Sequence, residues 1–155
     1  MKGAGRTTRG GTGWLPQHIV LEDDQGVVHA ATPLYVKGHS QGEYIFDHGW
    51  AEAYARGGGR YYPKLLSGVP FTPVPGTRLM ARDASARTAL VQALRDWCEN
   101  AGVSSLHILF AADEDLNACA QVGLMQRQTV QFHWKNVAPT LGTGVSSLPP
   151  EGALA

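Results

Sequence analysis

Cysteine is scarce in this chain, since Cys98 and Cys119 are the only two in 155 residues. They form no Cys-x-x-Cys pair and each falls in a segment with a helical pattern, so we expect small buried thiols in a reducing compartment. An excess of charge of either sign is also lacking, because 13 basic residues balance 13 acidic ones. No overall field therefore draws the protein to DNA or to an anionic membrane, and any contact with RNA would have to be local.

Long apolar runs are absent as well. No stretch approaches the roughly 18 apolar residues that a membrane-spanning helix needs. Residues 1–13 carry Lys2, Arg6 and Arg9 among glycines and lack the apolar segment of a signal peptide. Together these absences predict a cytoplasmic protein with neither a membrane anchor nor a DNA partner.

Three common chemical motifs are missing. The histidines show no His-x-His or His-x-x-x-His spacing, and the cysteines do not supplement them, so no metal site is predicted. The run Gly57-Gly58-Gly59-Arg60 lacks the Gly-Lys-Ser/Thr ending of a phosphate-binding loop. No Gly-x-Ser-x-Gly elbow is present, so covalent catalysis has no visible nucleophile.

The content of 43% hydrophobic and 17% charged residues suits one globular domain. We place this domain at residues 14–136. Residues 1–13 are Gly-rich, and residues 137–155 form a Ser/Pro/Gly tail whose only charged residue is Glu151. Both ends are therefore predicted to be disordered.

The first half of the domain is rich in β signals. A hairpin is expected from residues 18–22 and 27–36, joined by an Asp/Gly turn at residues 23–26. Further along we expect a short strand at residues 43–47 and a helix at 50–56 that is stopped by three glycines. A helical turn at 60–66 and an edge strand or loop at 69–74 follow.

The second half reads as helix, strand, short helix and strand. The first helix begins at a cap formed by Asp83 or Ser85 and ends at Gly102, with one face made by Ala86, Ala89, Leu90, Ala93, Leu94 and Trp97. It is followed by a strand at 103–110, a short helix at 113–123 and a strand at 124–134. In the short helix, Leu116, Cys119 and Ala120 are expected to face inward. This order predicts the α/β (α+β) class, with a mixed sheet and flanking helices.

Residues 42–79 are the most informative segment, because aromatic and ionisable side chains interrupt its apolar positions and need hydrogen-bond partners when buried. We therefore interpret it as the wall of a site. Tyr61, Tyr62 and Lys64 are candidates for binding substrate; the alternative is a helix start with packed aromatics and a solvated lysine.

Three further positions carry acid–base chemistry. Asp47 and His48 lie between Phe46 and Trp50, where Asp47 either accepts a proton from an attacking amine or caps the following helix. His107 points away from the Leu106/Ile108/Phe110 face, so it either reaches an open cleft or is a hydrogen-bonded second-layer residue. His133, beside Trp134, is either a cleft residue at a strand end or one of an amphipathic pair.

The order of elements resembles the acyltransferase fold of the GCN5-related N-acetyltransferases (GNAT). Seven segments in one order further resemble the bacterial FemAB-like predicted N-acyltransferases, labelled peptidoglycan biosynthesis or recognition proteins. The resemblance runs from about Gly13 to Asn136 and rests on these segments: residues 13–18, 32–35, 39–47, 61–65, 69–74, 105–110 and 131–134.

The resemblance implies an N-acyltransferase that moves an acyl or aminoacyl group onto an amine of a small molecule or peptide. The donor would be acyl-CoA or an aminoacyl-tRNA. The residues that would touch the acceptor are Trp50, Tyr61, Tyr62, Lys64 and His133, with Asp47 and His107 as catalytic groups. The turn that grips coenzyme A in GNAT enzymes corresponds to Pro75–Leu79, which keeps only the general layout, with Gly76, Thr77 and Arg78 as the contacts.

Family members continue into a basic segment and a second GNAT-like domain, so this chain resembles a truncated member. Two alternatives to catalysis stay open: a binding module for a peptide or cell-wall precursor, and a fragment that is inactive alone because it exposes surface made for a partner domain.

Overall fold

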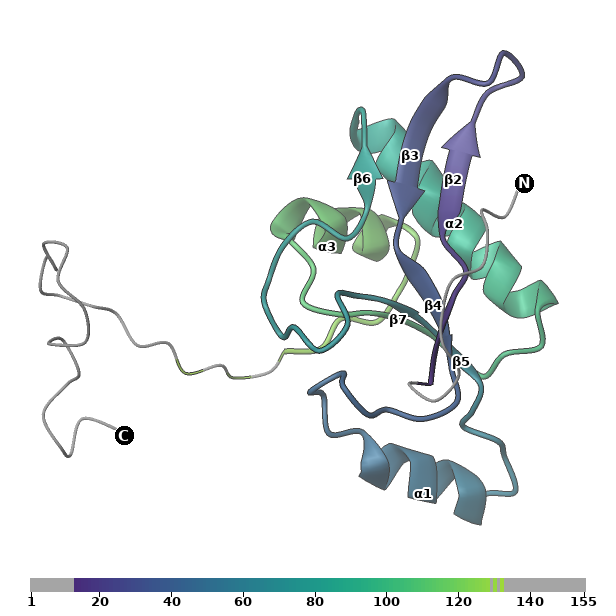
Figure 1. Ribbon diagram of the computed structural model, residues 1–155, viewed down its shortest axis with the longest axis vertical. Coiled ribbons are helices and arrows are strands. Elements are labelled where there is room, and N and C mark those ends of the chain that lie inside the picture. Colours follow the sequence, from purple (N-terminus) through teal and green to yellow (C-terminus); the bar gives the residue numbers. More distant parts are fainter. Residues whose placement is uncertain (1–12, 129, 131, 133–155) are drawn as a thin grey trace, which may run out of the picture.

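The computed structural model describes residues 13–128, 130 and 132. Its elements follow in the order β1 (Trp14–Pro16), β2 (Ile19–Glu22), β3 (Val28–Thr32), β4 (Leu34–Lys37), α1 (His48–Arg56), β5 (Lys64–Ser67), β6 (Met80–Ala81), α2 (Ala84–Asn100), β7 (Leu106–Ile108) and α3 (Asp113–Gln121). They build two sheets, ordered β1-β4-β5-β7 and β2-β3-β6 (Figure 1). Because β5 is antiparallel to β4 and parallel to β7, the larger sheet is mixed, and the predicted α+β class is confirmed.

The predicted hairpin is present, but its second strand divides at Pro33. The turn is fixed by Asp23, whose Oδ1 accepts hydrogen bonds from the backbone N–H groups of Gln25 and Val27 at 3.0 and 2.9 Å. Before Pro33 the chain pairs with β2, and after it β4 pairs with β1 and β5. Proline has no N–H for a sheet ladder. The two sheets therefore separate at this residue.

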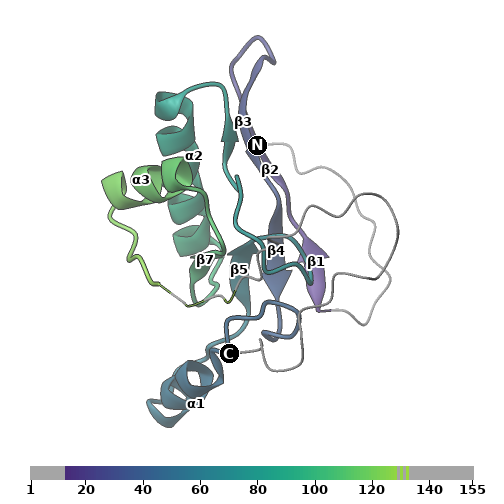
Figure 2. The same ribbon diagram turned by 90° about the vertical axis from the view of Figure 1, so that its left-hand side faces the viewer.

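Helices α2 and α3 lie together on one side of the strands (Figure 2). Asp83 caps α2 by accepting a hydrogen bond from the Ala86 N–H at 2.8 Å, which decides between the two predicted caps. Val91 is buried while Ala89 is exposed, so the apolar face of α2 is turned slightly from the predicted one. This face packs into the core with Ala30, Leu34, Leu65, Leu79, Ala118 and Cys119.

Two predictions in the first half are wrong. Residues 43–47 form no strand, because Tyr44 and Phe46 have φ angles of 59° and 50°, a left-handed conformation that a strand excludes. The helical turn predicted at residues 60–66 is absent, because residues 60–63 form no helix and Lys64–Ser67 form β5, inside the larger sheet. All four β5 residues are buried, and a strand covered on both faces lacks the alternation by which strands are recognised.

The second half departs from prediction mainly at its ends. The strand predicted at 103–110 is confirmed only as β7, and Phe110 has a φ of 52°. In α3 the buried residues are Asp115, Ala118 and Cys119, while Ala120 is exposed. Residues 124–128 form no strand, and much of the strand predicted to 134 lies outside the described residues.

The first helix, α1, stands at the end of the molecule away from the β2–β3 turn (Figure 1) and contains no buried residue. Among the described residues, no helix combines the length and the apolar character needed to cross a bilayer.

Candidate functional site

One face of the larger sheet carries polar side chains. Leu34, Val36 and Leu65 pack into the core with the helices. Since neighbouring residues of a strand point to opposite faces, Lys37, Lys64 and His107 share the other face. Lys37 and Lys64 are direct partners across β4 and β5, and His107 is the partner of Leu66. The loop between β4 and α1 and the segment before β5 supply most of the groups that these side chains contact.

Lys64 is completely buried and has three oxygen partners. Its Nζ donates to Glu43 Oε2 at 2.8 Å, to Asp47 Oδ2 at 2.6 Å and to Ser40 Oγ at 2.7 Å. An ammonium group has three N–H bonds, so Lys64 is fully satisfied. The alternative of a solvated lysine is therefore wrong.

Lys37 completes what we call the buried charge cluster, formed by Lys37, Glu43, Asp47 and Lys64. Its Nζ lies 3.8 Å from Glu43 Oε1, donates to the Gln41 carbonyl at 3.0 Å and stands 3.7 Å from the centre of the Trp14 ring. Burial lowers the pKa of Lys37 to about 8, and Lys64 adds to the lowering while Glu43 opposes it. Two cations balance two carboxylates, as buried charges require.

Asp47 stands at the boundary between this cluster and a group of aromatic rings. Burial raises its pKa, but hydrogen bonds from Lys64, Ser40 and Tyr61 outweigh burial and bring it to about 2. Asp47 occupies the position before α1, yet its side chain makes no capping hydrogen bond, so the prediction of a side-chain cap is wrong. Its Oδ1 is buried and accepts no hydrogen bond within the described part of the chain.

The aromatic cluster consists of Tyr54, Tyr61 and Tyr62, and His107 lies beside it. Tyr61 is its centre, with ring centroids 6.0 Å from Tyr54, 5.0 Å from Tyr62 and 6.3 Å from His107. Its hydroxyl donates to Asp47 Oδ2 at 2.8 Å. Burial and the Asp47 carboxylate raise the pKa of Tyr61, so this phenol keeps its proton at all ordinary pH values.

His107 faces the aromatic cluster and shares a hydrogen bond of 2.9 Å between its Nε2 and Ser105 Oγ. Burial lowers its pKa to about 4, with Lys64 and Arg127 lowering it further and Asp47 opposing them. The imidazole is therefore neutral at pH 7. A neutral imidazole has one nitrogen that can accept a proton.

Half of the ten predicted site residues thus gather at one place: Asp47, Tyr61, Tyr62, Lys64 and His107. Trp50 is 54% exposed on α1, and the guanidinium of Arg127 lies over its ring at 4.2 Å. His48 is exposed at the start of α1. His133 lies outside the described residues.

The predicted coenzyme A turn lies elsewhere. The Gly76 N–H donates to the Phe110 carbonyl at 2.9 Å and the Arg78 N–H to Asp115 Oδ2 at 2.6 Å. The Arg78 guanidinium is engaged with the carbonyls of Leu109 and Val74. Only Thr77 of the three is exposed, so two of the expected anion donors are occupied inside the protein.

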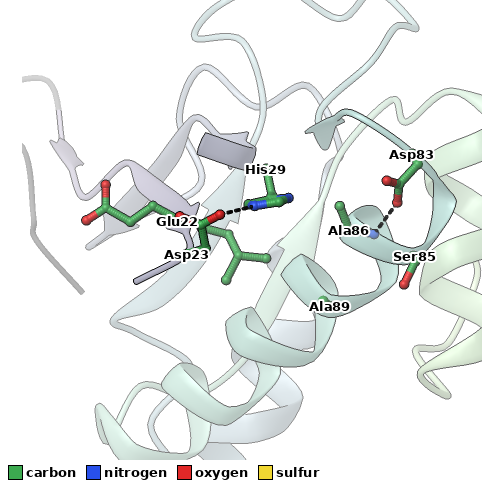
Figure 3. Close-up of a pocket in the computed structure, with 8 residues that line it drawn as sticks. Glu22, Asp23, His29, Asp83, Ser85, Ala86 and Ala89 are labelled. Atoms are coloured by element: carbon green, nitrogen blue, oxygen red, sulfur yellow. Dashed lines mark hydrogen bonds and ion pairs between the residues drawn. The ribbon is translucent and has the colours of Figure 1, made fainter. Parts of the chain in front are cut away.

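A separate concavity of about 310 Å³ lies between the β2–β3 turn and the start of α2 (Figure 3). It is lined by Leu21, Glu22, Asp23, His29, Asp83, Ser85, Ala86 and Ala89. Two of these acidic groups are already used, because Asp23 contacts His29 at 3.0 Å and Asp83 caps α2. None of the predicted site residues reaches this concavity.

Comparison with known protein families gave one decisive result. A model of the FemAB-like proteins, described as peptidoglycan biosynthesis/recognition, matches residues 4–140. The chain belongs to the FemAB-like family. Neither a curated protein nor a solved structure gave a significant match.

FemAB-like membership links the chain to peptidoglycan, and the match includes every residue of both clusters.

Sequence reasoning missed Lys37, Glu43 and Arg127 as members of the site. The signal for Lys37 was a charged residue ending the apolar run Leu34-Tyr35-Val36. For Glu43 it was an acidic residue on the same side of the loop as Asp47. Nothing in the sequence places Arg127 on Trp50, since that contact depends on how the chain returns from α3.

Proposed function

We propose that this FemAB-like chain is an N-acyltransferase-type domain with a GNAT-like sheet, and that it transfers an acyl or aminoacyl group onto an amine of a peptidoglycan precursor. The observation that carries this proposal is the neutral His107 beside the aromatic cluster, within a chain whose family is tied to peptidoglycan.

An amine that attacks an acyl group must lose a proton as the new C–N bond forms. His107 is suited to accept it, because its imidazole is neutral at pH 7 and lies beside the ring of Tyr61. Asp47 is a weaker candidate for this step, since a carboxyl group with a pKa of about 2 has little affinity for a proton. We therefore assign Asp47 a positioning role: it holds the Tyr61 hydroxyl and the Lys64 ammonium in place.

The exposed rings account for binding of the acceptor. Trp50 and Tyr54 are about half exposed and come from successive turns of α1, so they offer apolar surface on one side of the helix. Tyr61 and Tyr62 continue this surface toward His107. The donor, acyl-CoA or an aminoacyl-tRNA, would approach the same area. The Gly76–Arg78 turn contributes at most its exposed residue, Thr77.

The test is a product assay by mass spectrometry. Purified protein is mixed with a lysine-containing peptidoglycan stem peptide and either an acyl-CoA or an aminoacyl-tRNA, and a new amide is sought. Loss of a general base reduces rate by about 100-fold or more, so His107→Gln should do so while His29→Gln, in the other sheet, should not. Equal rates for both variants would remove His107 from the mechanism.

A second function, recognition of the precursor without turnover, is favoured by the internal pairing of the buried charge cluster. Every Lys64 donor is used within the protein, so this lysine is not available to a substrate. Stem-peptide binding by a folded sample, with no product from either donor class, would establish the recognition function and refute acyl transfer.

A further inference from the structure

Arg127 directly follows a segment that two hydrogen bonds hold against α3. The Leu124 N–H donates to the Cys119 carbonyl at 2.9 Å, and the Gln126 side-chain amide donates to the Leu116 carbonyl at 2.8 Å. Both bonds tie the chain leaving α3 to that helix. From there the chain runs toward the end of the molecule that carries α1 (Figure 2).

The guanidinium of Arg127 lies over the Trp50 ring, 4.2 Å from its centre. A planar guanidinium stacks well on an aromatic face and keeps its N–H groups directed outward from the edge of the stack. Trp50 thus orients the group without using its hydrogen-bond donors.

Arg127 makes no ion pair or hydrogen bond in the described part of the chain, whereas the Arg78 guanidinium donates to backbone carbonyls and Arg87 pairs with Glu114 and Asp115. Its charge also acts on His107, whose pKa is lowered first by burial, then by Lys64 and also by Arg127. A fixed cation with unused donors therefore lies within electrostatic range of the proposed proton acceptor.

We propose that Arg127, supported by Trp50, binds an oxyanion of the acceptor substrate, a carboxylate or a phosphate. Arginine recognises both groups by paired N–H donors, and charge-assisted hydrogen bonds of this kind are among the strongest in proteins. The inference rests on the proposed function, because it states which chemical class the acceptor belongs to: an amine that also carries an anionic group.

Two sources of the oxyanion are distinguished by matched probes in isothermal titration calorimetry. One pair is acetyl-lysyl-D-alanine with a free carboxylate and its C-terminal amide. The other pair is uridine diphosphate and uridine. Within each pair the probes differ in the anionic group, so a preference for the charged member measures its recognition directly.

The variants are Arg127→Gln, which removes the charge but keeps a planar end group, and Arg82→Gln as the control. Arg82 is exposed and lies next to β6, away from the aromatic cluster. We expect Arg127→Gln to weaken binding of the preferred anionic probe by about ten-fold or more, and Arg82→Gln to leave it unchanged. A preference for the peptide carboxylate identifies a peptide terminus, and a preference for the diphosphate identifies a nucleotide-linked precursor.

The inference is overturned if the wild-type protein binds no anionic probe more tightly than its neutral partner, or if Arg127→Gln and Arg82→Gln bind alike. These outcomes are separate from the failure of the proposed function, because binding is measured without turnover. Anion binding that depends on Arg127, in a protein that makes no product, would refute acyl transfer and leave this inference intact.

Discussion

At the scale of single residues, the main finding is that charge, not apolar volume, fills the space beneath the loop at 38–47. The sequence places Tyr44 and Phe46 alternately with Glu43, Ile45 and Asp47, which predicted a short strand. The structure buries the two carboxylates and exposes Phe46 to 84%, because two lysines lie below. The residue types were enough to predict a site in this segment. Which of its side chains point inward was not predictable, because this depends on the two lysines of β4 and β5.

Substitution of Lys64 by methionine should be strongly destabilising. It leaves the Glu43 and Asp47 carboxylates buried near Lys37 alone, and breaking a buried ion pair from one side costs about 3–5 kcal/mol. The measurement is the free energy of unfolding in urea. In an E43Q/D47N background the same substitution should cost clearly less, since no uncompensated negative charge remains. An equal cost in both backgrounds would contradict the electrostatic explanation.

The pH dependence of stability should report His107. Its pKa is about 4 in the folded state against 6.5 for an ordinary histidine, so the folded protein favours the neutral ring. This contribution is complete above pH 6.5 and is lost as the pH falls through 4, with a limit of about 3 kcal/mol. The free energy of unfolding, measured by denaturation between pH 7 and pH 4, should therefore fall less with decreasing pH in His107→Gln than in the wild type. If His107→Gln keeps the wild-type slope, the explanation fails.

At the scale of elements, local signals were sufficient for the hairpin and for α2 and α3, and insufficient for β5. The hairpin contains its turn aspartate, α2 contains a capping aspartate and apolar spacing of three and four, and α3 is followed by Gly123. The four residues of β5 are buried on both sides by other strands, helices and the loop before α1, so their pattern carries no period. The site was predictable as a segment because its residues are close in sequence, whereas the roles of Lys37 and Arg127 arise from contacts between distant elements.

The cap of α2 gives a clean test at this scale. Asp83→Ala should lower the free energy of unfolding by about 1 kcal/mol, because the Ala86 N–H loses its acceptor. Ser85→Ala, two positions along and exposed, should change it by much less. Thermal or urea denaturation of both variants measures the difference. A larger effect of the Ser85 substitution would instead support Ser85 as the capping residue, the alternative predicted from the sequence.

At the scale of the whole molecule, one carboxylate joins parts that belong to different sheets and helices. Asp115 on α3 accepts hydrogen bonds from the backbone N–H groups of Arg78 and Leu79, which lead into β6. It also pairs with Arg87 of α2 at 3.2 Å. The Arg78 side chain in turn donates to the carbonyl of Leu109, just beyond β7. The packing of α3 against the rest of the protein thus depends on a residue that was not among the inward-facing residues predicted for this helix.

Asp115→Ala should cost about 3 kcal/mol or more, since two buried N–H groups and a partly buried arginine lose their partner. Glu114→Ala is the matched control, because Glu114 also pairs with Arg87, at 2.9 Å, but is 75% exposed. Its cost should stay below about 1 kcal/mol. Urea denaturation measures both, and hydrogen exchange should show faster exchange in β6 and α3 together for Asp115→Ala. Similar costs for the two variants would refute the linking role of Asp115.

The direct pairing of Lys37 with Lys64 across β4 and β5 also bears on how the chain avoids misfolding. A slip of one residue between these strands would turn one lysine to the face occupied by the helices, where Leu34, Leu65 and Leu90 leave no partner for a charge. Glu43 would then hold a single lysine, and the other would be buried among leucines. The two cations therefore favour the native strand register over a shifted one, because only the native register brings both to the carboxylates of one loop.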